Sequence, residues 1–335
     1  MKKPDQHRID LQKKYNFSGK YFSRLVVDKK PWSALHQPLP QNFSLEDERS
    51  RQKLLNLIKI IKEHKSQDSF VYLDFSQVKI LFPMATIHFV QNVERYAHVK
   101  IRGRASGSPI VRGMLTKLSI HRRMNLQPCI NSHELIERWY TFSGEKTEFG
   151  EGYDEIEDIL REKFGDTETF DALNTAIGEA VNNVVEHAYE TNAKYKKWKI
   201  FLTINKEHCY VVISDLGLTI PHTVPTKVSE DILVRLTSIA TWKGINDGQR
   251  IRLASSYRKS ITELSHRGKG FSDMKAVCDQ ISNAKMIVHS RNGRWVNIPH
   301  EKDQISTFSE EVNGTIITWI LPLNNMNVEN NEQMA

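Results

Sequence analysis

Cysteine is scarce in this chain, and its scarcity excludes several kinds of protein. The 335 residues contain three cysteines, Cys129, Cys209 and Cys278, and none belongs to a CxxC pair. We therefore expect neither a disulfide framework nor a cysteine-rich zinc site, and a reducing compartment is the default. The 13 histidines form no HExxH or similar ligand spacing, so a zinc enzyme is not expected either.

Long apolar runs are also missing. No stretch approaches the roughly 18–20 apolar residues that a membrane span needs. The charged first eight residues are not followed by the apolar segment of a signal peptide. No Walker A motif is present to bind a nucleotide through a P-loop. The lack of a long apolar run and of a signal peptide predicts a cytoplasmic protein that does not engage a membrane.

Charge is unevenly distributed along the chain. Residues 1–123 contain 24 Lys or Arg and 10 Asp or Glu, whereas the remainder contains 23 and 30. The basic part suggests an anionic partner such as nucleic acid, or a surface that docks on the chain's own acidic C-terminal part. The basic cluster between Lys100 and Arg123 has little aromatic interleaving and no recognition-helix motif. Nucleic acid is therefore the less favoured partner.

The length of the chain suits two domains of ordinary size. Composition and hydrophobic periodicity predict a basic irregular segment over 1–48, an α/β domain over 49–132, an acidic linker or helical connector over 133–164 and a disordered tail over 324–335, which leaves residues 165–323 for a second domain. Within the first domain the pattern predicts helices over 46–65, 83–96 and 108–118, with strands over 70–75 and 99–102.

The strongest helical pattern runs from Phe170 to Tyr189, where apolar residues recur at three- and four-residue steps. This helix carries Glu179 and Asn183 four residues apart, and therefore on one face. A carboxylate can accept a proton from water or a hydroxyl. An amide oxygen suits Mg²⁺, which prefers oxygen ligands.

Three further motifs follow this helix. An apolar strand ends at Asp215, whose carboxylate could accept a hydrogen bond from an exocyclic amine such as that of adenine, and Gly217 would let the backbone approach a ligand plane. Gly268-Lys269-Gly270 opens a predicted helix, and the N–H groups at a helix N-terminus suit phosphate. Gly314 and Thr315 begin a β-rich strand.

In their order and spacing these pieces resemble the four motifs of the GHKL (Bergerat-fold) ATPases, over residues 165–323. The resemblance implies a Bergerat-fold α/β sandwich that binds ATP and Mg²⁺. It implies that Glu179 activates the attacking water or hydroxyl, that Asn183 holds Mg²⁺ and that Asp215 reads the adenine amine. The other nucleotide-binding positions that it implies are Gly217, Ile220, Arg267, Gly268, Lys269, Gly270 and Thr315.

The chain departs from the family pattern at Thr219, where a second glycine is common. The stretch from Pro221 to Arg267 would be the ATP lid, and its Lys and Arg side chains could reach the phosphates. Sensor histidine kinases usually carry Asn at the position of Glu179. The run 178–189 is instead most similar to the anti-sigma-factor serine kinases. His133 is not expected to be a phosphoacceptor, because the residues that should follow it are absent.

Residues 68–122 resemble a STAS domain, the fold of anti-sigma-factor antagonists. In those antagonists a serine in a short turn is phosphorylated by the kinase. The corresponding stretch here is Phe82-Pro83-Met84-Ala85, and the nearest hydroxyl belongs to Thr86 just beyond it. The resemblance therefore implies a docking or dimerising module rather than a phosphorylated switch.

Three functions remain open at this point. The first is an ATP-gated switch with slow hydrolysis that signals through the STAS-like module to a regulatory partner protein. The second is a serine/threonine kinase, or an anti-sigma factor, that acts on a separate STAS-like or sigma-factor-like partner. The third is a nucleic-acid-binding regulator. Because GHKL relatives often dimerise, a homodimer is also open.

Overall fold

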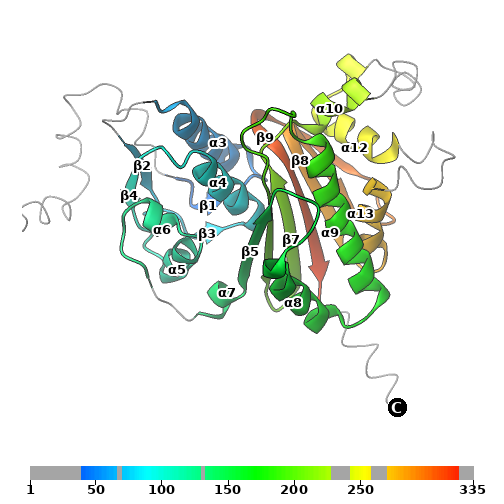
Figure 1. Cartoon of the computed structure of the whole chain (residues 1–335), viewed down its shortest axis with the longest axis horizontal. Helices are drawn as coiled ribbons and strands as arrows, with labels where there is room; N and C mark the ends of the chain where they lie inside the picture. Colours follow the sequence, from blue (N-terminus) through cyan, green and yellow to red (C-terminus); the bar gives the residue numbers. More distant parts are fainter. Residues whose placement is uncertain (1–38, 66–69, 130–132, 228–241, 258–269, 324–335) are drawn as a thin grey trace, which may run out of the picture.

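The computed structural model describes residues 39–65, 70–129, 133–227, 242–257 and 270–323. Two parts lie side by side (Figure 1): residues 39–129, which we call the N-terminal module, and residues 133–323, which we call the sheet domain. Most of the predicted segment 1–48 and all of the predicted tail 324–335 lie outside the described residues. Among the described helices, none combines the length and the apolar character that crossing a bilayer requires.

The N-terminal module alternates short strands with helices. Its elements are β1 (Asn42–Phe43), α3 (Glu48–Glu63), β2 (Val71–Asp74), β3 (Ile80–Leu81), α4 (Pro83–Arg95), β4 (Ile101–Arg104), α5 (Pro109–Lys117) and α6 (Ile120–Arg123). The strands form two parallel pairs, β1 with β3 and β2 with β4. Parallel pairs need crossover connections, and helices supply them here. The helices and strands predicted over 46–118 correspond to α3, β2, α4, β4 and α5.

The helix starts in the module follow from the local sequence. The side chain of Asp47 accepts a hydrogen bond from the backbone N–H of Ser50 at 2.8 Å, which caps α3. Both α4 and α5 have a proline in the first turn, where the missing N–H costs nothing. Ser108 caps α5 in the same way that Asp47 caps α3.

The sheet domain is built on one antiparallel five-stranded sheet in the order β5-β6-β7-β9-β8. In chain order its elements are α7 (Glu134–Glu137), β5 (Trp139–Gly144), α8 (Asp154–Phe164), α9 (Glu168–His187), β6 (Trp198–Ile204), β7 (His208–Asp215), α10 (Ile220–Lys227), α12 (Asp247–Tyr257), α13 (Gly270–Asp279), β8 (Lys285–Asn297) and β9 (Gln304–Pro322).

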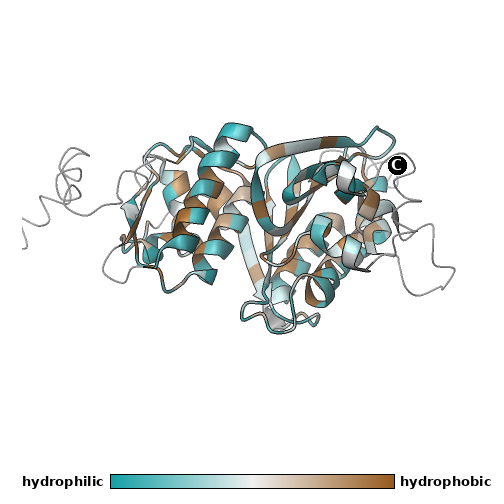
Figure 2. Ribbon diagram, turned by 90° about the horizontal axis from the view of Figure 1, so that it is seen from above, coloured by the Kyte–Doolittle hydropathy of each residue, from teal (hydrophilic) through white to brown (hydrophobic). Residues whose placement is uncertain are grey.

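Both faces of this sheet are covered. On β6, Ile200 and Leu202 join the core under α8, α9 and α13, whereas Phe201 joins the core of the N-terminal module. On β7, Val212 likewise faces the module. Strands buried on both sides read as nearly continuous apolar runs, and β6 is buried at every position and apolar except at Lys199 and Thr203. In Figure 2 hydrophobic residues gather on the inner sides of the helices and hydrophilic residues on the outer sides.

A buried polar network joins the two parts on the module side of the sheet. Arg51 of α3 is fully buried, and its guanidinium donates to the backbone carbonyls of Arg291 and Glu310, each at 3.0 Å. It lies 3.1 Å from Nδ1 of His289 and 4.3 Å from the ring centre of Phe308. The contact is therefore an apolar core pinned by a few buried hydrogen bonds.

The segment 133–164, expected to be an acidic linker or a helical connector, contains α7, β5 and α8 in the structure. Strand β5 pairs with β6, and α8 buries Ile156, Leu160 and Phe164 against the core shared with α9. Acidic residues occupy the exposed face of α8, which explains why composition indicated a linker. The apolar spacing, not the mean charge, decides where this helix packs.

Candidate functional site

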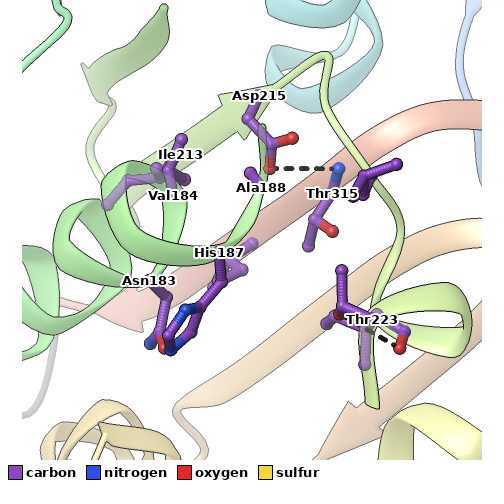
Figure 3. Close-up of a pocket in the computed structure, with 11 residues that line it drawn as sticks. Asn183, Val184, His187, Ala188, Ile213, Asp215, Thr223 and Thr315 are labelled. Atoms are coloured by element: carbon purple, nitrogen blue, oxygen red, sulfur yellow. Dashed lines mark hydrogen bonds between the residues drawn. The ribbon is translucent and has the colours of Figure 1, made fainter. Parts of the chain in front are cut away.

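A pocket opens beside the C-terminal half of α9, at the end of β7. About 390 Å³ of space lies between its lining residues, and part of that space is open solvent. Its lining is Asn183, Val184, His187, Ala188, Ile213, Asp215, Leu218, Ile220, Thr223, Thr315 and Ile317. The structure thus brings four of the expected site residues together: Ile220 and the three that Figure 3 labels, Asn183, Asp215 and Thr315.

Asp215 reaches the pocket because of the alternation along β7. Side chains two residues apart point to the same face of a strand, so Asp215 shares the face of Ile213, which packs on the α9 side. Its Oδ1 accepts a hydrogen bond from the backbone N–H of Gly217 at 2.8 Å, and its Oδ2 accepts one from the N–H of Thr315 at 3.2 Å. The carboxylate is therefore held in one orientation.

Burial controls the charge of Asp215. Its side chain is 2% exposed, and removal from water raises the pKa of the carboxyl to about 7, against the opposing effect of the two backbone hydrogen bonds. A carboxylate has about four acceptor positions, so two remain for a ligand. The Asp215 carboxyl can be either neutral or charged near neutral pH, and it lies within apolar walls. It therefore suits an uncharged hydrogen-bond donor, such as the exocyclic amine of a base, better than a cation.

Two glycines allow the chain to close around this acid. A Cβ on Gly217 would overlap the carbonyl oxygen of Ala188, which accepts a hydrogen bond from the N–H of Leu218 at 2.5 Å. Gly314 has a φ of 71°, and a Cβ there would overlap both the backbone and the carboxylate of Asp215. Only glycine fits at either position without rearrangement.

Ser290 was not predicted from the sequence and holds three parts of the site together. Its hydroxyl accepts from the N–H of Ile220 at 2.9 Å, hydrogen bonds to the Thr315 hydroxyl at 3.0 Å and donates to the carbonyl of Gly314 at 3.2 Å. A single serine inside a strand, far from the other motifs in sequence, carries no local signal of this role.

Helix α9 supplies the polar end of the pocket. The Nδ2 of Asn183 donates to the backbone carbonyl of Glu179 at 2.8 Å, so the oxygen of the amide is the atom turned away from the helix. This chemistry fits a hard cation such as Mg²⁺. Glu179 lies one turn earlier, is half-buried and is not among the lining residues. His187 follows Asn183 by one turn and does line the pocket (Figure 3).

The structure describes only part of the stretch 267–270 that was predicted to bind the nucleotide. Gly270 is buried and begins α13, which packs against α9 in the same core. Arg267, Gly268 and Lys269 lie outside the described residues. In the described part of the expected lid, Arg250 pairs with Asp247 at 2.6 Å and Arg252 with Asp303 at 3.0 Å.

A comparison with known protein families found a match within the sheet domain. A family model described as a histidine kinase-like ATPase domain matches residues 143–239, which include α8, α9, β6 and β7. The match supports a GHKL-type ATPase domain, and with it ATP binding, within the sheet domain. It begins after the N-terminal module. A comparison with curated proteins found no match.

Proposed function

We propose that the protein is a Mg²⁺- and ATP-dependent regulatory switch that signals through its N-terminal module to a partner protein. The observation that supports this most directly is the buried Asp215 at the end of β7, with Gly217 beside it and apolar walls around it. Together with the family match, these features support binding of an adenine base, with Asp215 accepting its exocyclic amine.

The polar end of the pocket supports a role for α9 in phosphate chemistry. The Asn183 oxygen would hold Mg²⁺, and Glu179 would accept a proton from the attacking water or hydroxyl. Mg²⁺-ATP, when bound, supplies a phosphoanhydride bond that can be cleaved. Slow cleavage would reset the switch.

The module is proposed as the output because it shares a core with the sheet that carries the site. Strand β7 turns Asp215 toward the pocket and Val212 toward the module. A change at the nucleotide would therefore reach the module through one strand. The STAS-like character of the module and its regulatory partner rest on sequence resemblance.

Nucleotide titration by calorimetry on the full chain tests the proposal. We expect Asp215→Ala and Asn183→Ala to weaken Mg²⁺-ATP binding by roughly ten- to a hundredfold, the loss that follows from removing a hydrogen bond or ligand contact to a charged group. Asn182→Ala is the matched control, since Asn182 is the neighbouring asparagine and does not line the pocket. Equal affinity in all four proteins would overturn the proposal.

Hydrolysis and phosphotransfer are separated by the fate of the γ-phosphate. The closeness of residues 178–189 to anti-sigma-factor serine kinases supports transfer to a protein hydroxyl as the alternative activity. Labelled γ-phosphate on a co-purified protein would indicate the kinase, and release as inorganic phosphate the switch. Salt-sensitive nucleic-acid binding that ignores ATP would instead support the third function.

A further inference from the structure

Helix α4 of the N-terminal module donates hydrogen bonds to the backbone on both sides of Asp215. The Nε2 of Gln91 donates to the carbonyl of Ser214 at 3.2 Å, and Nη1 of Arg95 donates to the carbonyl of Leu216 at 2.7 Å. Gln91 and Arg95 are four residues apart and therefore lie on one face of α4. The backbone carbonyls of Ser214 and Leu216, on either side of Asp215, are thus both hydrogen-bonded to the N-terminal module.

The peptide groups of Leu216 are held from two directions. Its N–H donates to the Tyr189 hydroxyl of the α9 side at 2.9 Å, while its carbonyl accepts from Arg95 of α4. The Tyr189 hydroxyl in turn donates to the carbonyl of Lys197 at 2.7 Å, which also accepts from Gln91 at 3.1 Å. The turn that follows Asp215 therefore bridges the module and the helix beside the pocket.

Gln91 and Arg95 are the residues of α4 for which hydrogen bonds to this turn and the strand end are described. Gln91 is fully buried, and the Arg95 guanidinium lies 5.4 Å from the ring centre of Tyr195 and 5.8 Å from that of Tyr96. Elsewhere the module packs on the sheet through apolar residues such as Phe201 and Val212, and through polar contacts such as those of Arg51. Removing either donor should leave that apolar contact while it releases the turn.

We infer that Gln91 and Arg95 are positioning residues for the adenine-binding turn, so that docking of the N-terminal module and ATP binding are coupled. The inference rests on the proposed function for its ligand. A turn held at Ser214 and Leu216 keeps Asp215 and Gly217 ready for the base. Because coupling between two binding events is reciprocal, ATP stabilises the docked module by the same factor that docking raises ATP affinity.

The test compares Arg95→Met, which keeps the aliphatic stem, with Arg95→Lys and with the control Glu94→Gln. Glu94 lies on the same helix and contacts the sheet through Lys199, but not the turn. In titrations we expect Arg95→Met to lose about tenfold in affinity for ATP, within the usual range of coupling between sites. We expect Arg95→Lys to retain part of it and Glu94→Gln to retain all of it.

Base discrimination separates positioning from general destabilisation. We expect Arg95→Met to narrow the preference for ATP over GTP and to bind tripolyphosphate as the parent does, because the phosphate end is not held by α4. Equal ATP affinity and equal preference in Arg95→Met and Glu94→Gln would overturn the inference. Absence of ATP binding in the parent would instead overturn the proposed function.

Hydrogen exchange tests the positioning without any nucleotide. In Arg95→Met, amides of residues 215–218 should exchange faster, while those in the middle of β6 and β7 should be unchanged. Unchanged exchange at 215–218 would also overturn the inference. If Arg95→Met does not fold, Gln91→Met, which keeps nearly the same volume, provides the same two readouts.

Discussion

The backbone N–H of Thr315 donates to the carboxylate of Asp215 over 3.2 Å, although 100 residues separate the two in sequence. The contact is made because β9 lies next to β7 in the sheet. Gly314 brings the strand close enough, since any side chain there would overlap Asp215. The motif around Gly217 and the motif Gly314-Thr315 thus meet at Asp215, whose ionisation and role in binding can be measured.

We expect adenosine affinity to fall as the pH is lowered through 7. Burial raises the pKa of Asp215 to about 7, and an amine donor favours the ionised carboxylate. Affinity should therefore be greatest above pH 7 and should decrease below it, by up to about tenfold per pH unit. Calorimetry between pH 6 and 8 measures this, and adenosine avoids titration of the ligand's phosphates.

Asp215→Asn is the control for this pH dependence. The amide keeps an acceptor oxygen but does not titrate, so adenosine binding should be weaker and flat with pH. A flat profile in the parent, or the same slope in Asp215→Asn, would show that another group is responsible. His187 also lines the pocket, and His187→Gln identifies its contribution.

We expect opposite effects from two glycine-to-alanine changes. Gly314 has a φ of 71° and no room for a Cβ, so Gly314→Ala should lower the free energy of unfolding by at least ~1–3 kcal/mol. Gly178 lies inside α9, and a Cβ there would meet nothing within 4 Å. Gly178→Ala should therefore raise the free energy of unfolding by about 1 kcal/mol.

Urea denaturation measures both changes. The comparison is informative because the two variants add the same methyl group within one domain. Stabilisation by Gly314→Ala would mean that the backbone at Gly314, inside β9, adopts another conformation. Nucleotide affinity should fall only in Gly314→Ala, since its clash is with Asp215.

Substitutions at Glu179 and at Asn183 should have different effects on ATP cleavage and on ATP binding. If Glu179 is the general base, Glu179→Gln should bind Mg²⁺-ATP as the parent does but cleave it roughly 10²–10⁴-fold more slowly. Asn183→Ala should weaken Mg²⁺-ATP binding and leave adenosine binding unchanged, because its amide lies at the polar end of the pocket. Loss of adenosine binding in Asn183→Ala would instead indicate a damaged helix.

The motifs were predictable because each depends on local chemistry. The helix over 170–189 follows from its apolar spacing, and the position of Asp215 follows from an apolar strand that ends at an acid. That Thr315 lies close to Asp215 was implied only by the family resemblance. Ser290 could not be found, since a buried serine in a strand looks like any other until its neighbours are known.

The covering of the sheet by the N-terminal module was not predictable in detail. The largely apolar sequence of β6 indicates two covered faces, but it does not say which helices cover them. Charge suggested that the basic part docks on the acidic part, whereas the contact is largely apolar with a buried network around Arg51. Hydrogen bonds over such sequence separations depend on the assembled fold.

We expect the protein to lose stability as the pH falls below 6.5, in part through His88. This side chain on α4 is fully buried, and within the described part of the chain neither ring nitrogen has a hydrogen-bond partner. Burial lowers its pKa to about 3, with a further contribution from the nearby charge of Arg51. Between pH 6.5 and 3 the unfolded chain therefore binds a proton that the folded protein does not.

The free energy of unfolding must then decrease with falling pH over that window, by up to about 1.4 kcal/mol per pH unit for this one group. His88→Leu removes both the titration and two unpaired buried nitrogens, so its advantage over the parent should grow from pH 7.5 to pH 5. His98→Leu, at an exposed histidine just beyond α4, is the control for the same substitution at a surface position. Parallel curves for the parent and His88→Leu in urea denaturation at several pH values would show that water reaches this position, and that the core between module and sheet is less closed than its packing indicates.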